Sequence, residues 1–199
     1  MNLEDFKLLY VLSCIALGFV ILSPTLAMVI KLPSGERFSE LWILGSDHMA
    51  EDYPFNVKEK EVYKVYLDIG NHMGSLEYYR VYVKLINQTE PVPYAVNGTP
   101  STLEPLLEYH AFLSDNETWE KEILFSFEDV SFDRNVSKVS KLVINDYTFE
   151  IDKVAMWDEE NHGFYFQLFF ELWLYDATAA SFEFHNRFVG IRLNMTESA

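Results

Sequence analysis

The sequence predicts an all-β protein, an immunoglobulin-like antiparallel β-sandwich tethered by one N-terminal transmembrane helix. Residues 8–30 are an uncharged apolar run, apolar and polar residues alternate in short segments after Lys31, and turn residues separate those segments. Strands with one apolar face can bury it when two sheets pack face to face, whereas a single sheet leaves it in water.

The N-terminal run, Leu8–Ile30, contains 23 residues without a charged side chain. As a helix it extends about 35 Å, slightly more than the hydrocarbon core of a bilayer. Hydrocarbon offers no hydrogen-bond partners, so the backbone must satisfy its own polar groups as a helix. The sequence therefore predicts a short cytoplasmic tail at 1–7, a transmembrane helix at 8–30 and an extracytoplasmic domain at 31–199.

A cleavable signal peptide is the alternative for this run. Thr25 and Ala27 have the small-residue spacing that a signal peptidase recognises. However, the run is longer than a usual signal-peptide core, and the preceding Glu4, Asp5 and Lys7 are not net positive. We therefore expect a retained anchor, with the lipid bilayer as the partner of this run.

Glycosylation signals set the expected orientation of the chain. Chance supplies about one Asn-x-Ser/Thr acceptor in a sequence of this composition, and five occur after the anchor. They are Asn87, Asn97, Asn116, Asn135 and Asn194. Because N-glycans are attached to surfaces outside the cytoplasm, the expected location is the cell membrane, single-pass, with the C-terminal domain outside the cell.

The expected domain is strongly acidic. The chain has a formal net charge of −16, of which residues 1–30 contribute −1, so the domain carries −15. Such a charge repels nucleic acid and anionic lipid head groups, so nucleic acid is not an expected partner. The single cysteine, Cys14, lies in the apolar run, which excludes a disulfide framework or a thiolate metal site from the domain.

Alternation predicts strands over 61–71 and 78–86. Their expected buried sides are Tyr63, Val65, Leu67 and Ile69 in the first strand and Tyr79, Val81, Val83 and Leu85 in the second. Lys64 and Asp68, and Arg80 and Lys84, fall on the opposite sides. The glycine-containing segment 70–75 predicts a hairpin between the two strands. Residues 87–105, with four prolines, predict an exposed loop.

Further strands are expected at 109–113 and 121–127, and at 139–144 and 147–151 as a hairpin across Asn145-Asp146. The polar segment 128–138 separates the two groups.

The strongest strand signal is Phe164–Tyr175, whose even positions are all apolar and predict a core face. Its odd positions mix Gln167 and Glu171 with four aromatic residues that form a candidate contact surface, Tyr165, Phe169, Trp173 and Tyr175. Cover of this face by a loop or by side chains of a neighbouring strand is the alternative. A last strand at 188–195 should direct Asn194 towards solvent.

The segment after the apolar run carries the most distinctive motif, GERFSELWILGSDHMAEDYP at 35–54. It resembles the opening motif of an uncharacterised archaeal membrane-protein family, domain of unknown function 1616, with the approximate pattern Gly-Glu-x-Phe-Thr-Glu-Phe-Tyr-Ile-Leu-Gly followed by Ala-x-x-Tyr-Pro. The matching positions are Gly35, Glu36, Phe38, Glu40, Ile43, Leu44, Gly45, Ala50, Tyr53 and Pro54. The similarity continues through 69–72 and 116–120, as far as Phe127.

The resemblance implies an archaeal, membrane-tethered β-domain that faces outwards, and it implies no activity. Members of that family commonly carry several membrane helices before this domain, whereas one is expected here. The motif segment itself is too apolar for a free linker, so we expect it to pack on the domain. Replacing Phe38 by Ala should cost about 3 kcal/mol if its ring is fully buried.

No catalytic residue, metal site or cofactor is expected, and the chain is not expected to be an enzyme. The five histidines, His48, His72, His110, His162 and His185, lack zinc-ligand spacing, and the sequence contains no nucleophile elbow, P-loop or dinucleotide motif. The run DEENHG at 158–163 resembles the start of a calcium loop, but Phe169 stands where the bidentate glutamate is required. An acidic turn is the simpler interpretation.

Two functions from different classes remain. The first is a membrane-anchored extracytoplasmic interaction or structural protein of the cell envelope, an accessory component of an assembly with other envelope or membrane proteins. The second is a surface module that binds a glycan or another ligand through exposed aromatic side chains such as Trp42, Trp119 and Trp157.

Overall fold

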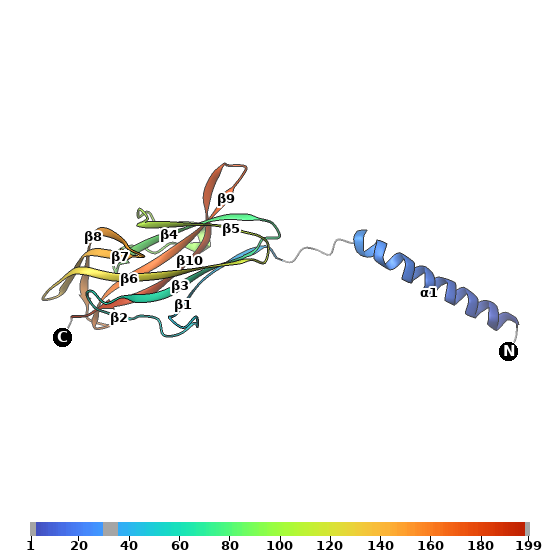
Figure 1. Cartoon of the computed structure of the whole chain (residues 1–199), viewed down its shortest axis with the longest axis horizontal. Helices are drawn as coiled ribbons and strands as arrows, with labels where there is room; N and C mark the ends of the chain where they lie inside the picture. The colour runs from blue at the N-terminus through green and yellow to red at the C-terminus, as the bar shows by residue number, and fades with distance from the viewer. Residues whose placement is uncertain (1–2, 30–35, 198–199) are drawn as a thin grey trace. The chain divides into compact units, whose positions relative to one another are not determined.

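The computed structural model describes residues 3–29 and 36–197, with side chains at 6–7, 9–20 and 36–197. The chain divides into two compact units, Met1–Arg37 and Phe38–Ala199. Within the described residues, the first unit contains one helix, α1 (Leu3–Val29), and the second is built from strands with one 3-10 helix, η1 (Ala95–Asn97) (Figure 1).

The predicted helix is confirmed over all but its last residue, Ile30, which lies outside the described residues. The transmembrane part of that prediction gains no support, because no helix in the described residues is both long enough and apolar enough to cross a membrane.

The second unit is a two-layer β-sandwich (Figure 1). Its strands are β1 (Phe38–Leu44), β2 (Asn56–Val57), β3 (Tyr63–His72), β4 (Glu77–Asn87), β5 (Leu107–Leu113), β6 (Thr118–Asp133), β7 (Val136–Ile144), β8 (Tyr147–Asp158), β9 (Gly163–Asp176) and β10 (Ser181–Met195). The first sheet has the order β1-β3-β6-β7-β8 and the second has the order β5-β4-β9-β10-β2. A short pairing of β8 with β9 joins the sheets, and of these strand pairs only β10 and β2 run parallel. The all-β sandwich is therefore confirmed, whereas its immunoglobulin-like topology stays a prediction.

The core lies between the two sheets. Side chains that are at most 1% exposed come from the first sheet (Val65, Leu67, Ile123, Phe125, Leu142) and from the second (Tyr79, Val81, Val83, Phe166, Phe170). Phe127 and Phe166 meet across the interface with ring centroids 6.4 Å apart. The inward faces of β3, β4 and β9 match the predicted alternation, because successive side chains of a strand point to opposite faces.

The predicted hairpin between β3 and β4 is wrong. β3 pairs with β1 and β6 in the first sheet, whereas β4 pairs with β5 and β9 in the second. The connection instead passes from one sheet to the other, where the side-chain amide of Asn71 donates 2.8 Å hydrogen bonds to the carbonyls of Ser75 and Leu113. Glycines indicate that the chain reverses, but they do not determine which sheet the next strand joins.

The polar segment 128–138 also differs from its expected role as a separator. β6 continues to Asp133 and β7 begins at Val136, with Val130 and Phe132 packed against the core. The hairpin across Asn145-Asp146 is confirmed, and both residues have positive φ, 45° and 71°. This left-handed conformation is the one that a type I′ turn requires.

The motif segment after the apolar run packs as expected at Leu41 to Leu44, whereas residues 47–53 are exposed and Gly35 lies outside the described residues. It forms β1, with Ser39 and Ile43 buried, and the Tyr53 hydroxyl donates a 2.8 Å hydrogen bond to the Ile43 carbonyl. Phe38, however, is 38% exposed. Because it lies at a sheet edge beside His72, its replacement by Ala does not meet the condition for the full 3 kcal/mol cost.

Candidate functional site

The outer face of the second sheet, the side away from the core, carries two regions of opposite character. We call Lys84, Phe169 and Glu171 the covered half, and Tyr78, Arg80, His110, Phe112, Tyr175 and Phe182 the open half. The strand register places them along the same strands: Lys84 lies beside Phe169, while Tyr78 lies beside Phe112 and Arg80 beside His110. The two halves therefore share one scaffold.

The covered half is organised by a buried ion pair. Lys84 Nζ lies 2.9 Å from Glu171 Oε2, and the two side chains are 3% and 0% exposed. The covering loop, residues 88–106, completes their hydrogen bonds at Ser101, whose carbonyl accepts from Lys84 at 2.9 Å and whose N–H donates to Glu171 Oε1 at 2.7 Å. Phe169 beside the pair is fully buried. The two charges thus compensate each other, and the loop supplies backbone hydrogen bonds to both.

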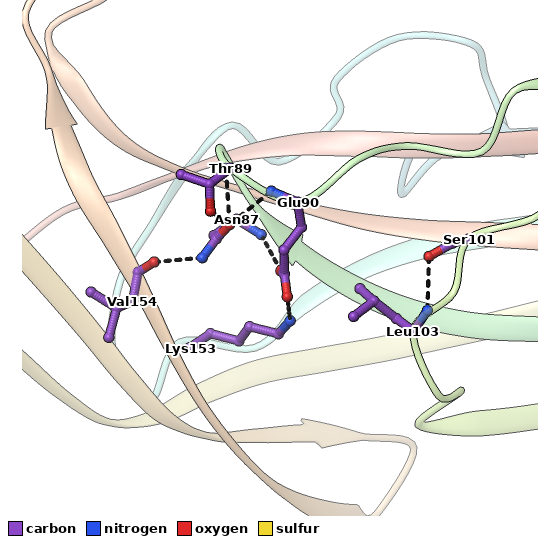
Figure 2. A network of polar contacts seen from close by, with 7 residues as sticks. All are labelled: Asn87, Thr89, Glu90, Ser101, Leu103, Lys153 and Val154. Carbon is purple, nitrogen blue, oxygen red and sulfur yellow. Dashed lines mark hydrogen bonds and ion pairs between the residues drawn. The ribbon is translucent and has the colours of Figure 1, made fainter.

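The start of the covering loop is tied to β8 (Figure 2). Asn87 Nδ2 donates to the Val154 carbonyl at 2.8 Å, and Asn87 Oδ1 accepts from the N–H groups of Thr89 and Glu90. The Glu90 carboxylate pairs with Lys153 and also accepts from the Asn87 N–H. The predicted loop at 87–105 is confirmed as a loop, but it is anchored at both ends and covers Lys84, which the alternation assigned to the polar side of β4.

The open half is a cluster of aromatic rings that stays accessible. Tyr78 and Phe112 stack in parallel with centroids 4.0 Å apart, and Phe182 meets Tyr78 edge to face at 4.9 Å. Tyr175 packs against Phe182 at 5.3 Å. Phe112 is 66% exposed although it has a stacking partner. The outer ring of the cluster therefore offers a flat apolar surface to solvent.

A cation lies at the centre of the open half. The Arg80 guanidinium sits 3.9 Å from the centroid of Phe182, and its Nη1 donates to the Tyr82 hydroxyl at 2.9 Å. Arg80 Nε is buried and has no hydrogen-bond partner among the described residues. Exposed Glu108 is 3.8 Å from Arg80, and its carboxylate also meets His110 at 3.2 Å. The open half thus combines stacked rings with a guanidinium, a carboxylate and an imidazole.

The predicted contact residues of β9 divide between these environments. Tyr165 and Phe169 are 5% and 0% exposed, so they do not form a contact surface, and cover is the correct alternative for them. Trp173 is half-buried, donates to Glu171 Oε2 and packs edge to face on Tyr82, and Tyr175 belongs to the open half. Tyr78, Phe112 and Phe182 were missed, although Tyr78 lies on the face of β4 opposite the predicted apolar side.

The tryptophans named for ligand binding are less available than expected. Trp42 is half-buried, and Trp119 and Trp157 are partly buried and pack against the core.

The glycan acceptors also fall into two groups. Asn97, Asn116 and Asn135 are exposed, whereas Asn87 and Asn194 are half-buried. Asn194 Nδ2 donates to Asn56 Oδ1 at 2.9 Å, as Asn87 does to Val154. Since a glycan is attached through Nδ2, modification of either half-buried acceptor requires this bond to be rearranged or the sugar to fit beside it.

A second polar cluster lies on the outer face of the first sheet. His48 stacks on Tyr66 at 3.7 Å and its Nδ1 lies 3.0 Å from Glu120, the cross-strand neighbour of Asp68. Asp68 is 3% exposed, and its Oδ2 has no hydrogen-bond partner among the described residues. Burial, reinforced by the nearby Glu120 charge, raises the pKa of Asp68 from 3.8 to about 6. Within the described residues, no group of three or more His, Cys, Asp or Glu side chains is placed to hold a metal ion.

The run at 158–163 is an acidic turn in the structure. Asp158 Oδ1 accepts hydrogen bonds from the N–H groups of Glu160 and Asn161, both at 3.0 Å, which fixes the turn before β9. The backbone N–H of Asn161, then the side-chain amide of Asn161 and then the N–H of Glu160 lower the pKa of Asp158.

Comparison with known families identifies one match. The family described as "Domain of unknown function (DUF1616)" matches residues 32–139, which include β1 to β6 and the start of β7. Comparison with curated proteins finds no matching relative.

Solved structures give a looser likeness. The chain is similar to the CARDB domain of a Pyrococcus furiosus protein in complex with di-metal ions, at TM-score 0.40 and 8% identity, over 83% of this chain and 94% of that one. It is also similar to a mutant Listeria innocua β-glucosidase in complex with laminaribiose, at TM-score 0.39 and 8% identity, over 80% of this chain. The same enzyme with isofagomine gives TM-score 0.38 at 10% identity over 81% of this chain. The chain spans only 16% of the β-glucosidase, and at these TM-scores the likeness carries no argument about function.

Proposed function

The chain belongs to the DUF1616 family, and on that premise we propose that it is an interaction protein of the cell envelope that binds a partner protein through the open half. The observation that carries this proposal is the exposed stack of Tyr78 and Phe112 beside Arg80. Tyrosine, tryptophan and arginine are the residues enriched among those that dominate binding energy at protein interfaces. The family match includes β4 and β5, which supply these three residues.

The exposure of Phe112 and the fixed position of Arg80 support a protein partner for the open half. Phe112 buries one ring face on Tyr78 and leaves the other to water, so covering it removes apolar surface from water without ordering a long flexible side chain. Arg80 is already held by Phe182 and Tyr82, so a carboxylate or carbonyl of a partner meets a pre-positioned donor.

A membrane tether is the second element of the proposal. It is supported by the uncharged run at 8–30, by the helical backbone of α1 and by the excess of glycan acceptors after it. In this proposal the domain stands outside the cell on a single anchor. Protease added to intact cells should degrade the domain, and deletion of residues 1–30 should release it from the membrane fraction. Recovery of the whole domain after protease treatment would contradict this placement.

A photo-crosslinking experiment tests the contact surface. A photoreactive phenylalanine analogue at position 112 should crosslink in native cells to one predominant protein. The matched control is position 147, because Tyr147 is also an aromatic residue with 61% exposure but lies on β8 in the first sheet. Equal crosslinking from both positions, or none from position 112, would reject the open half as a protein contact.

Glycan binding is the second candidate function, favoured by one specific feature. Stacked rings flanked by Arg80, Glu108 and His110 combine the apolar platform and the hydrogen-bonding groups that a sugar ring can use. If this function holds, the purified chain should bind members of a glycan array, and Phe112→Ser should abolish binding while Tyr147→Ser leaves it intact. Crosslinking to protein from position 112 together with a silent array would reject this candidate.

A further inference from the structure

An open groove separates the edges of the two sheets at one side of the sandwich. β1 is the edge of the first sheet. Among residues 36–197, β10 is paired with a strand on its outer edge only at Asn194 and Met195, where β2 joins it. A groove of about 610 Å³ is lined by Phe38 to Trp42 of β1 and by Arg187 and Phe188 of β10. A second hollow of about 330 Å³, lined by Val189 to Arg192, continues along β10.

The lining of the groove shows that it is bounded by backbone. Six consecutive residues of β1, 38–43, and six consecutive residues of β10, 187–192, line the two hollows. Side chains on one face of a strand alternate, so an uninterrupted run is expected where the strand's edge, with its N–H and C=O groups, faces the space. Unpaired edges of this kind are templates for another strand.

The chain itself shows that the β10 edge accepts an extended segment. At the end of the groove, Asn194 N–H donates to the Phe55 carbonyl at 2.6 Å and Thr196 N–H donates to the Val57 carbonyl at 2.8 Å. This segment pairs as a strand beside β10 only over the two residues of β2, and we call the space along the outer edge of β10 the lane. The residues before β2, Tyr53, Pro54 and Phe55, line the second hollow. Proline has no N–H to donate, which suits a position where pairing stops. The rest of the lane, from Arg192 back to Arg187, has no strand of the described chain beside it.

We propose that this groove is a β-augmentation site, in which an extended segment of another polypeptide pairs with the free edge of β10 beyond β2. The free edge from Arg187 to Arg192 accommodates about six residues, or about 20 Å of extended chain. Main-chain hydrogen bonds supply the binding, and alternate side chains of the guest face the apolar floor formed by Leu41, Ile43 and Ile191.

Charge selects the guest. Exposed Arg187 stands at one end of the free edge, so a guest with an acidic residue at that position meets a cation there. The same net charge disfavours a second copy of this chain as the occupant, because two domains that each carry −15 repel one another. The occupant is therefore an extended, apolar and acidic segment of a different protein.

Synthetic peptides test the proposal on the full chain in detergent. The probe is a seven-residue peptide of alternating valine and threonine, with a terminal aspartate in one version and a terminal lysine in another. At ten times its dissociation constant, the aspartate peptide should slow amide hydrogen exchange about tenfold in residues 187–192. Absence of protection there at millimolar peptide would overturn the proposal.

Backbone methylation separates strand pairing from side-chain adhesion. N-methyl groups on alternate residues remove the N–H donors along one edge of the peptide, and shifting them by one residue removes those of the other edge. At least one of these two versions should fail to bind, since it cannot pair with β10. Equal binding by the unmodified peptide and both methylated versions would overturn the proposal.

Two variants test the selection by charge. Arg187→Glu should reverse the preference from the aspartate to the lysine peptide, while Lys138→Glu makes the same charge change on β7 and should leave the preference unchanged. An unchanged preference in Arg187→Glu would show that Arg187 does not select the guest. Protection of residues 187–192 that rises with the concentration of the chain alone would identify a second copy as the occupant and contradict the proposal.

Discussion

The covered and open halves of the second sheet use the same strands and similar residues, yet one is core-like and the other faces water. Phe169 and Phe112 both point to the outer face, but Phe169 is fully buried and Phe112 is 66% exposed. The difference is the covering loop, which reaches across to Glu171 through Ser101 and is tied to β8 through Asn87. A strand's sequence thus determines which side chains share a face, and a distant segment determines whether that face is buried.

Replacement of Glu171 should have the largest effect on the free energy of unfolding. Glu171→Ala leaves Lys84 as a buried charge without its partner, and breaking such a pair costs about 3–5 kcal/mol. Replacing both residues by apolar ones of similar size should cost much less, because no charge is then left alone. Urea denaturation of the single variants and of Lys84→Met/Glu171→Leu checks this prediction. A double variant as unstable as Glu171→Ala would contradict this prediction, because it would show that the ion pair itself adds to the free energy of unfolding.

The anchor of the covering loop should have an intermediate effect. Asn87→Ala removes the bond to Val154 and those to Thr89 and Glu90, with an expected cost of about 1–2 kcal/mol. The loosened loop should then be cut faster by protease near Val96, which is 87% exposed. Thr99→Ala is a control in the same loop, since its side-chain hydroxyl contacts Asn97 and the change removes one glycan acceptor, as Asn87→Ala does. Both variants are compared as unglycosylated protein. Cleavage rates that are equal in both variants would show that Asn87 does not hold the loop.

Asp68 on the first sheet is a useful contrast with Glu171, because its Oδ2 atom is buried without a hydrogen-bond partner in the part of the chain that the structure describes. Its pKa is raised from 3.8 to about 6 in the folded protein, so the folded state holds the proton more tightly than the unfolded state between these values. Stability should therefore fall as the pH rises through this window. Asp68→Asn cannot ionise, so it should be more stable than the wild type at pH 7, by on the order of 1 kcal/mol, and nearly equal at pH 4. Thermal melts at the two pH values check this, and the same difference at both would refute the assignment.

The open half should give the smallest effect on folding. Phe112→Ser changes an exposed side chain, so its free energy of unfolding should stay within about 1 kcal/mol of the wild type. Its effect should appear in partner binding, measured by co-purification of the crosslinked partner, while Tyr147→Ser retains binding. Loss of stability comparable to that of Glu171→Ala would mean that Phe112 supports the fold. The contrast between a core-like covered half and a solvent-facing open half would then not hold.

Sequence alternation predicted the inward faces of the strands well. It failed for properties that depend on which strands pair, such as the sheet that a strand joins. Val81 and Leu168 were expected in the core and are buried there. The hairpin at 70–75 failed because turn residues reverse the chain equally well within a sheet and between sheets. Phe112 was missed as a contact residue because its ring belongs to an aromatic cluster only through its stacking on Tyr78. The register of β4 and β5 makes the two residues neighbours.

The sequence by itself determined the all-β class, the side-chain alternation, the hairpin across Asn145-Asp146 and the membership of the DUF1616 family. These properties depend on residues close together in the chain, whose conformational preferences act in any context. The tertiary structure alone decided that Lys84 is buried with Glu171. It also decided that, among the described residues, no strand pairs with the β10 edge at 187–192 and Asp68 Oδ2 is buried without a hydrogen-bond partner. Each of these depends on segments that meet only after folding, because burial and pairing are properties of the packed sheets and not of any one strand.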